Sequence, residues 1–283
     1  MSYQEFRPMR FQILPPVVKN LLIINGILFL ATVVFSDKFG LDLTRYLGLH
    51  FFTSEYFRPH QLVTHLFMHG GFTHIFSNML ALWMFGNVLE NVWGGKRFLI
   101  FYLVTGLGAA LIHSAVTWYE IAAMQAKVNV FVQSGGPVDF RILVDQYARY
   151  IGYDQLMNIQ AFINEWKSMP GDVVMKEEAA DFAQLLVDRK ADIPIVGASG
   201  AVFGVLLAFG MMFPNTLIYL YFFVPIKAKW FVVLYGAFEL YSGLQGNPGD
   251  NVAHFAHLGG MLFGYILMRS WNKRRFDPFR DQY

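Results

Sequence analysis

Residues 252–271 read VAHFAHLGGMLFGYILMRSW, a stretch long and apolar enough to cross a membrane as a helix. About 20 residues in a helix span the bilayer's hydrocarbon core of about 30 Å. His254 and His257 are costly in lipid unless they have partners or a function. Gly260 and Gly264 lie four residues apart, on a small-residue face that lets another helix approach closely. The stretch therefore predicts a spanning helix that carries histidine chemistry against a neighbour.

The composition extends the membrane assignment to the whole chain. Of its 283 residues, 55% are hydrophobic and 15% charged, whereas a soluble domain usually carries about 25% charged residues. The sequence predicts an all-α membrane protein of six transmembrane helices. Besides 252–271, the segments near spanning length with few internal charges are 17–35, 72–93, 98–116, 199–213 and 230–244. Between the fourth and fifth, the apolar connector 214–226 cannot be distinguished from a helix extension by periodicity.

Lysine and arginine predict the orientation through the positive-inside rule. Basic residues gather before the first span, after the second, after the fourth and after the last, whereas the last outer loop has none. An even number of spans with both termini cytoplasmic follows. The basic residues on the predicted inner side are Arg7, Arg10, Lys19, Lys96, Arg97, Lys227, Lys229, Lys273, Arg274, Arg275 and Arg280.

One long segment does not resemble a membrane helix. Residues 117–194 hold seven Lys and Arg against eleven Asp and Glu, a net charge of −4. Helical spacing over 140–151 and 177–187, separated by Gly and Pro, predicts a small helical insertion on the outer side. The predicted organisation is therefore a cytoplasmic N-terminal segment (1–16), spans one to three with the first outer loop (17–116), an acidic outer insertion (117–194), spans four to six (195–271) and a basic cytoplasmic tail (272–283).

Several kinds of site and partner are not indicated. The absence of cysteine excludes a disulfide framework and a thiolate metal site. The net charge of +2 does not indicate a nucleic-acid partner. The N-terminus lacks a short apolar region followed by a small-residue cleavage site, so we expect no removable signal peptide. No cofactor is expected, and the oligomeric state stays open.

Polar residues of three predicted spans converge at one depth. Spans two, four and six all run inward, so His74 and Asn78, Ser199, and His257 each fall within the first two turns of a helix. A histidine near neutral pH can take the proton of a serine hydroxyl and make it nucleophilic. His74 and Asn78, four residues apart, can aim two donors at the resulting oxyanion, together with the Ser199 amide. This combination predicts serine-based hydrolysis.

Two histidines compete for the role of base. His257 precedes Gly260 and Gly264 by three and seven residues, which places all three on one helical face, whereas His254 turns partly away. We therefore choose His257 as base and give His254 a supporting role. No acidic residue is expected in a span at that depth, so the prediction is a Ser–His dyad. Glu239 is expected to be structural, like Glu90.

At this point the motifs resemble those of the rhomboid intramembrane proteases. Gly197-Ala198-Ser199-Gly200 is similar to their GxSG motif, Ala256-His257 through Gly260 to Gly264 is similar to AHxxGxxxG, and His74 with Asn78 is similar to HxxxN. The resemblance implies a six-helix rhomboid bundle in which Ser199 is the nucleophile and His257 the base. It also implies an oxyanion hole made by His74, Asn78 and the Ser199 amide. Phe203 stands where a Tyr that stacks on the histidine is frequent.

The resemblance further implies cleavage of transmembrane protein substrates near the outer ends of their spans, without a metal. It implies a multi-pass protein of the lipid bilayer, and the compact core suggests a bacterial inner (plasma) membrane. Three alternatives stay open. One is a metal site made of His65, His69, His74 and His254, which has the weakness that no Glu completes a HExxH pattern. The others are a catalytically silent relative that binds membrane clients, and a small transporter.

Overall fold

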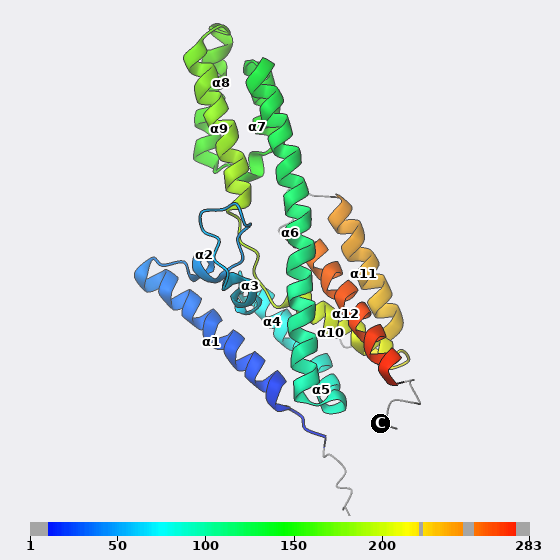
Figure 1. Cartoon of the computed structure of the whole chain (residues 1–283). Coiled ribbons are helices and arrows are strands. Elements are labelled where there is room, and N and C mark those ends of the chain that lie inside the picture. Colours follow the sequence, from blue (N-terminus) through cyan, green and yellow to red (C-terminus); the bar gives the residue numbers. More distant parts are fainter. Residues whose placement is uncertain (1–10, 221–222, 246–251, 276–283) are drawn as a thin grey trace, which may run out of the picture.

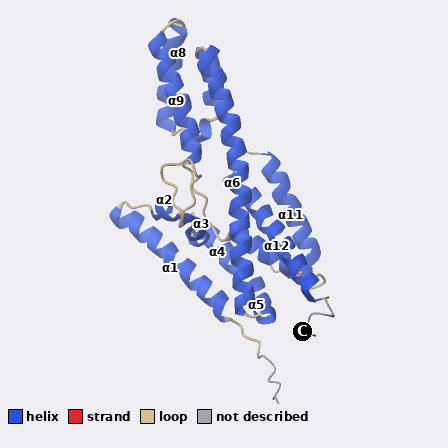
Figure 2. Cartoon of the chain, in the orientation of Figure 1, coloured by secondary structure: helices blue, strands red, loops and turns tan. Residues whose placement is uncertain are grey.

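A computed structural model describes residues 11–220, 223–245 and 252–275, and these are predominantly helical (Figures 1 and 2). In the first half of the chain the helices are α1 (Pro16–Phe39), α2 (Leu43–Leu47), α3 (Gln61–Thr64), the 3-10 turn η1 (His65–Phe67), α4 (Phe72–Ala81), the π-helical turn η2 (Leu82–Gly86), α5 (Asn87–Trp93) and α6 (Gly95–Ser134). In the second half they are α7 (Pro137–Gln146), the 3-10 turn η3 (Ala148–Tyr150), α8 (Tyr153–Ser168), α9 (Val173–Ala191), α10 (Ser199–Met212), α11 (Ala228–Gln245) and α12 (His254–Arg275).

Each of the six predicted spanning segments is helical, although the segment 72–93 is divided into α4, η2 and α5, and α6 is longer than the segment predicted over 98–116. By length and composition, two of the described helices could cross a membrane, Pro16–Phe39 and Gly95–Ser134, and α10 is a shorter apolar helix. The lengths of the helices therefore do not by themselves establish six spans. The helix predicted over 98–116 continues without a break to Ser134.

The connector 214–226, whose structure the sequence left open, is not an extension of a helix. This segment forms a hairpin in which β1 (Leu217–Leu220) pairs antiparallel with β2 (Val224–Lys227), with Leu217 opposite Lys227. Pro214 follows the last residues of α10, and a proline cannot donate the hydrogen bond that would extend that helix. The apolar run therefore turns back on itself instead of continuing α10 toward α11.

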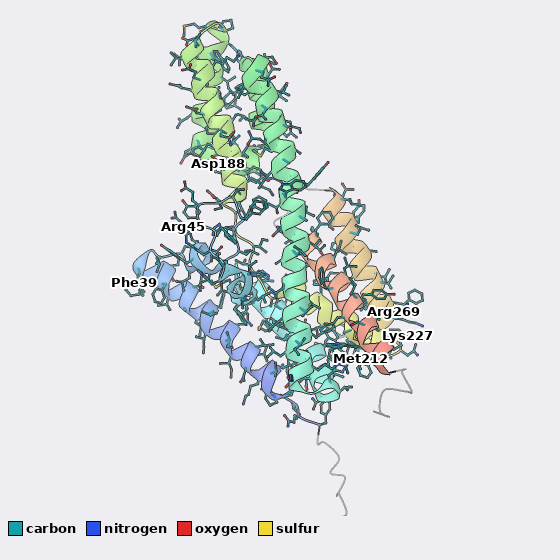
Figure 3. The ribbon with its side chains drawn as sticks, viewed as in Figure 1. Phe39, Arg45, Asp188, Met212, Lys227 and Arg269 are labelled. Carbon is teal, nitrogen blue, oxygen red and sulfur yellow. The ribbon has the colours of Figure 1, made fainter. Side chains whose placement is uncertain are left out.

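Helix α10 occupies the centre of a bundle in which it contacts α6, α11 and α12. Its residues are almost all buried, from Gly200 through Gly210. Figure 1 shows α6 running beside α10 and α12 and continuing well beyond them. The apolar core of this bundle includes Phe98, Tyr102 and Val205, none of which is exposed to solvent. Many apolar side chains on the outer face of α1 are exposed, as expected of a helix in contact with lipid (Figure 3).

The predicted small-residue faces of α10 and α12 meet in the structure. A Cβ placed on Gly260 would overlap the carbonyl oxygen of Gly200, and a Cβ on Gly264 would lie 3.3 Å from the Cα of Gly204. On the other side of α10, a Cβ on Gly200 would overlap the Cβ of Ala109 in α6. The two backbones therefore approach so closely that only glycine fits at Gly260.

A second apolar core surrounds the far half of α6. Met124, Val128 and Phe131 of α6 pack with residues of α7, α8 and α9, among them Trp166, which is 1% exposed. Figure 1 shows α7, α8 and α9 gathered at the end of α6 that is remote from α10–α12. At 1.5 Å per residue, the 40 residues of α6 extend about 60 Å, twice the apolar thickness of a bilayer. The part of α6 from residue 124 therefore forms a distinct helical lobe with α7, α8 and the part of α9 that packs on them.

Glu90 of α5 contacts the N-terminus of α1, at the end of the bundle away from the helical lobe. Its carboxylate accepts hydrogen bonds from the backbone N–H groups of Val17 (2.9 Å) and Val18 (2.7 Å), which are among the unsatisfied donors at the start of α1. A carboxylate at a helix N-terminus is also favoured by the helix dipole. The contact joins α5 to α1 and is structural, as the sequence suggested.

We expect Gly260→Ala to lower the thermal unfolding midpoint in mild detergent by at least about 5 °C, because the new methyl group forces the backbones of α10 and α12 apart. The matched control is Gly26→Ala in α1, where a Cβ would meet nothing within 4 Å. That control should unfold at or slightly above the wild-type temperature, since alanine favours a helix over glycine. Equal midpoints for the two variants would contradict the close contact.

Candidate active site

Ser199 begins α10 and is held there by a segment with extended backbone. Ile195 pairs with Leu49 through two backbone hydrogen bonds of 2.8 and 2.9 Å, and the Gly197 amide donates to the carbonyl of His65 at 2.9 Å. Gly197 has a φ of +121°, a conformation that other residues rarely adopt. Ser199 therefore follows a segment that is fixed by hydrogen bonds to the loop between α1 and α4.

The loop that supports this segment depends on one buried glutamine. The side chain of Gln61, 1% exposed, donates to the carbonyls of Tyr56 (2.8 Å) and Tyr46 (3.3 Å). Its oxygen accepts from the backbone N–H groups of Arg58 and His50. The single amide joins four points of the loop between α1 and α4, which makes that loop compact. Sequence reasoning did not identify Gln61.

His74 of α4 lies directly beside the serine. A Cβ on Gly197 would sit 2.7 Å from His74 Nε2 and 3.6 Å from Ser199 Oγ, which places those two side-chain atoms no more than about 6.3 Å apart. One turn further along α4, Asn78 is 5% exposed, and its Nδ2 donor has no hydrogen-bond partner among the described residues. An amide donor that is buried without an acceptor is costly, and a bound oxyanion would satisfy it.

His257 of α12 is stacked on Phe203 of α10. The two rings lie 4.1 Å apart between centroids and within 5° of parallel, and Phe203 is one turn after Ser199. Rhomboid proteases frequently have a tyrosine at the position of Phe203, and the phenyl ring makes the stacking contact with the histidine that is expected of that tyrosine. A Cβ on Gly200 would lie 3.5 Å from the Ala256 carbonyl, so the chain segments carrying Ser199 and His257 are in direct contact. His257 is 8% exposed.

The prediction that no acidic residue reaches this depth is wrong. Glu239 of α11 is 3% exposed, and its Oε2 accepts hydrogen bonds from His257 Nδ1 at 2.8 Å and from His254 Nδ1 at 2.6 Å. The prediction failed because it considered only the starts of spans predicted to run inward, whereas α11 carries Glu239 near its end, six residues before Gln245. The same depth criterion applied to the end of that span would have found it.

The three side chains Glu239, His254 and His257 are also the described residues whose donor atoms gather closely enough to hold a metal ion, within 4.8 Å of one another. Ligands on one zinc ion stand about 3.3 Å apart when the bonds are 2.0–2.1 Å and tetrahedral. Separations of 2.6 and 2.8 Å are hydrogen-bond lengths. The metal site suggested by the sequence comprised His65, His69, His74 and His254, and this cluster shares only His254 with it.

The electrostatics of the site follow from this pattern. A carboxylate can only accept, so each Nδ1 atom that bonds Glu239 carries its hydrogen, and the Nε2 atom of His257 is then able to act as a base. His74 and His257 are near enough for a charge on one ring to affect the other. The arrangement combines a hydroxyl, an oriented imidazole and buried amide and imidazole donors, which are the parts required for acyl transfer.

These features describe a candidate serine-hydrolase site among helices, and the rhomboid domain family matches residues 55–123 and 174–271. The match covers more than half of the chain, which therefore belongs to the rhomboid family. Membership indicates a membrane protein. The unmatched residues 124–173 fall within the second apolar core, on the part of α6 that extends beyond the bundle and on α7 and α8.

Curated relatives give the same family. RHOMBOID-like protein 12, mitochondrial, of Arabidopsis thaliana is 26% identical over 263 residues, which cover 92% of this chain and 60% of that protein. Rhomboid protein 1, mitochondrial, of Saccharomyces cerevisiae is 24% identical over 213 residues, 74% of this chain and 42% of that protein. Rhomboid protease GluP of Bacillus subtilis is 31% identical over 68 residues, 24% of this chain and 13% of that protein.

The chain thus spans about three fifths of the first relative and two fifths of the second. Both relatives that cover most of the chain are mitochondrial by name, which argues against the bacterial plasma membrane expected from the compact core.

The pH dependence of stability can be predicted from His69, which lies between η1 and α4 and is 3% exposed. Burial, aided by repulsion from His74, lowers the pKa of His69 from 6.5 to about 4, and burial also lowers the pKa of His65. The unfolded chain therefore binds protons below pH 6.5 that the folded chain does not bind until about pH 4. Stability should be fully present above pH 6.5 and should fall progressively toward pH 4.

The measurement is the unfolding midpoint in detergent at several pH values between 7.5 and 4. His69→Asn should flatten the decline, although the remaining His65 keeps part of it. A variant with the same slope as the wild type would contradict this origin of the acid sensitivity.

Proposed function

We propose that the protein is an intramembrane serine endopeptidase that cleaves transmembrane proteins through Ser199 and His257. The observation that carries the proposal is the stacking of buried His257 on Phe203, one turn after Ser199 in α10. This contact supports a fixed imidazole next to a serine at a helix N-terminus, within a family that includes a protein named as a protease.

The mechanism follows from the donors and acceptors present. Ser199 Oγ attacks the carbonyl carbon of the scissile bond while His257 Nε2 takes its proton. The oxyanion receives hydrogen bonds from the Ser199 amide, Asn78 Nδ2 and the ring of His74. The imidazolium then returns its proton to the leaving amine, and the C–N bond breaks. Water, deprotonated by His257, hydrolyses the acyl-enzyme and restores the serine.

We further propose six spans with both termini on the cytoplasmic side, carried by α1, the continuous α4–α5 segment, the first half of α6, α10, α11 and α12. Helix α10 has 14 residues and a length of about 21 Å, less than the bilayer's apolar thickness. A short span of this kind supports a Ser199 that lies below the outer surface in a cavity reached by water. A substrate helix must unwind to expose its peptide bond there, so small or helix-breaking residues near the cut are expected.

The test compares purified wild type, Ser199→Ala and His257→Ala in mild detergent. Wild type should cut a single-span substrate near the outer end of the span and react with a fluorophosphonate probe. The variants should lose cleavage by at least about 1,000-fold, because nucleophile and base act as one unit. Folded wild type that neither cleaves nor reacts would instead indicate a relative that binds membrane clients.

The proposal extends to the helical lobe formed by α7, α8 and the parts of α6 and α9 that pack on them. We infer that it lies on the outer side, where its position on α6 would let it recruit or select substrates. It is tied to the first outer loop, since Ser54 Oγ donates to Asp192 at 2.6 Å and the Phe51 amide to the Ala191 carbonyl.

Replacing residues 135–171 with a short Gly-Ser linker should leave fluorophosphonate labelling of Ser199 intact, because the bundle core does not include that segment. Cleavage should change across a panel of substrates that differ in their outer flanking sequences. If the same substrates are cleaved at the same rates after the replacement, the lobe does not select substrates. The control is a linker of the same composition inserted at Gly152, where a Cβ meets nothing within 4 Å.

A further inference from the structure

We propose that Glu239 is a positioning residue for the base, so that the site operates as a Ser199–His257–Glu239 triad rather than a dyad. The inference rests on the proposed function and deepens it. Glu239 touches neither substrate nor serine in this arrangement and acts through the His257 ring.

The geometry is that of a carboxylate orienting an imidazole. Glu239 Oε2 lies 2.8 Å from His257 Nδ1, on the opposite edge of the ring from the Nε2 atom that must face the serine. The hydrogen bond fixes the tautomer with hydrogen on Nδ1 and leaves Nε2 able to accept a proton. Phe203 restricts the ring in the remaining direction, because the stacked planes prevent it from tilting. The ring is therefore held at its edge and on its face.

The charge of Glu239 has a use in the reaction. When His257 takes the serine proton it becomes a cation in a site that is nearly closed to water, where an unpaired charge is costly. The carboxylate at hydrogen-bond distance stabilises that cation as it forms. His254, whose Nδ1 donates to the same oxygen at 2.6 Å, keeps the carboxylate paired between turnovers. The sequence-based interpretation of Glu239 as merely structural does not account for this shared oxygen.

Other titratable groups surround the ring and bear on any pH measurement. They are His74 from α4, His113 from α6, Tyr235 and Glu239 from α11, and His254 from α12 itself. Of these, Glu239 is the acidic group in contact with His257 among the described residues. Its removal should therefore affect His257 more than the removal of any other single neighbour.

The experiment uses Glu239→Gln in the full-length chain, with Glu90→Gln as the matched control. Both glutamates are 3% exposed and accept two hydrogen bonds, but Glu90 stabilises the start of α1. The measurements are kcat and KM for a single-span substrate, the rate of Ser199 labelling by a fluorophosphonate from pH 5 to 9, and the unfolding midpoint. Rates are expressed per folded molecule.

We expect Glu239→Gln to lower kcat by about 100-fold or more with little change in KM, by analogy with loss of the acidic member of a serine-protease triad. The midpoint of its pH–labelling profile should differ from that of wild type, because the carboxylate in contact with His257 is gone. Glu239→Asp should recover part of kcat and of the midpoint. Glu90→Gln should lower the unfolding midpoint while keeping the wild-type pH profile.

Wild-type kcat and pH midpoint in folded Glu239→Gln would overturn the proposal, as would a loss no larger than that of Glu90→Gln. Reversible loss of wild-type activity on treatment with a chelator, restored by zinc and absent in Glu239→Gln, would overturn it in favour of a metal site. If wild type is inactive, the proposed function itself fails and takes this role with it. An active wild type with an indifferent Glu239 removes the positioning role alone.

Discussion

Direct contact between the backbones of α10 and α12 determines where every other group of the site can lie. The carbonyl of Gly200 reaches the Cα of Gly260 so closely that no side chain fits between them. Since Ser199 precedes one glycine and His257 lies one turn before the other, this approach brings the proposed nucleophile and base near each other from two helices. In lipid, where apolar side chains gain little by associating, such close packing between small residues is a main source of helix–helix attraction. The packing of α10 on α12 and the proposed chemistry therefore both depend on Gly200 and Gly260.

The residues of the candidate site could be predicted where the sequence of a single helix was enough to identify them. Polar groups are rare in apolar helices, so Ser199, His74, Asn78 and His257 could be found from depth alone, and family motifs point to the same positions. Their contacts fit that selection, since His74 lies beside Ser199 and His257 stacks on Phe203. Glu239 was missed because it stands near the end of a helix of opposite direction, and its pairing with two histidines depends on how α11 packs against α12.

Features that depend on distant contacts could not be predicted from sequence. Pro214 favours an end to α10, but the apolar residues after it suit a strand as well as a helix, and the pairing of β1 with β2 decides between them. Likewise, the boundary expected after residue 116 is absent, since α6 passes from one apolar core to the other without a helix break. Gln61 is an ordinary loop residue in sequence, and its four hydrogen bonds appear only once the loop is folded.

In the proposed triad, the hydrogen bond between Glu239 and His257 would couple catalysis to the position of α11. Helix α11 presents Phe238 and Tyr241 outward on the turn that holds Glu239, and it contacts the rest of the bundle mainly through α12 and α10. Any outward tilt of its last two turns, for instance to admit a substrate helix, lengthens the hydrogen bond to His257 Nδ1 and leaves the ring less firmly oriented. The enzyme would then be competent when α11 is seated and impaired when it is displaced, so a protein that held α11 away from α12 would act as an inhibitor without touching the serine.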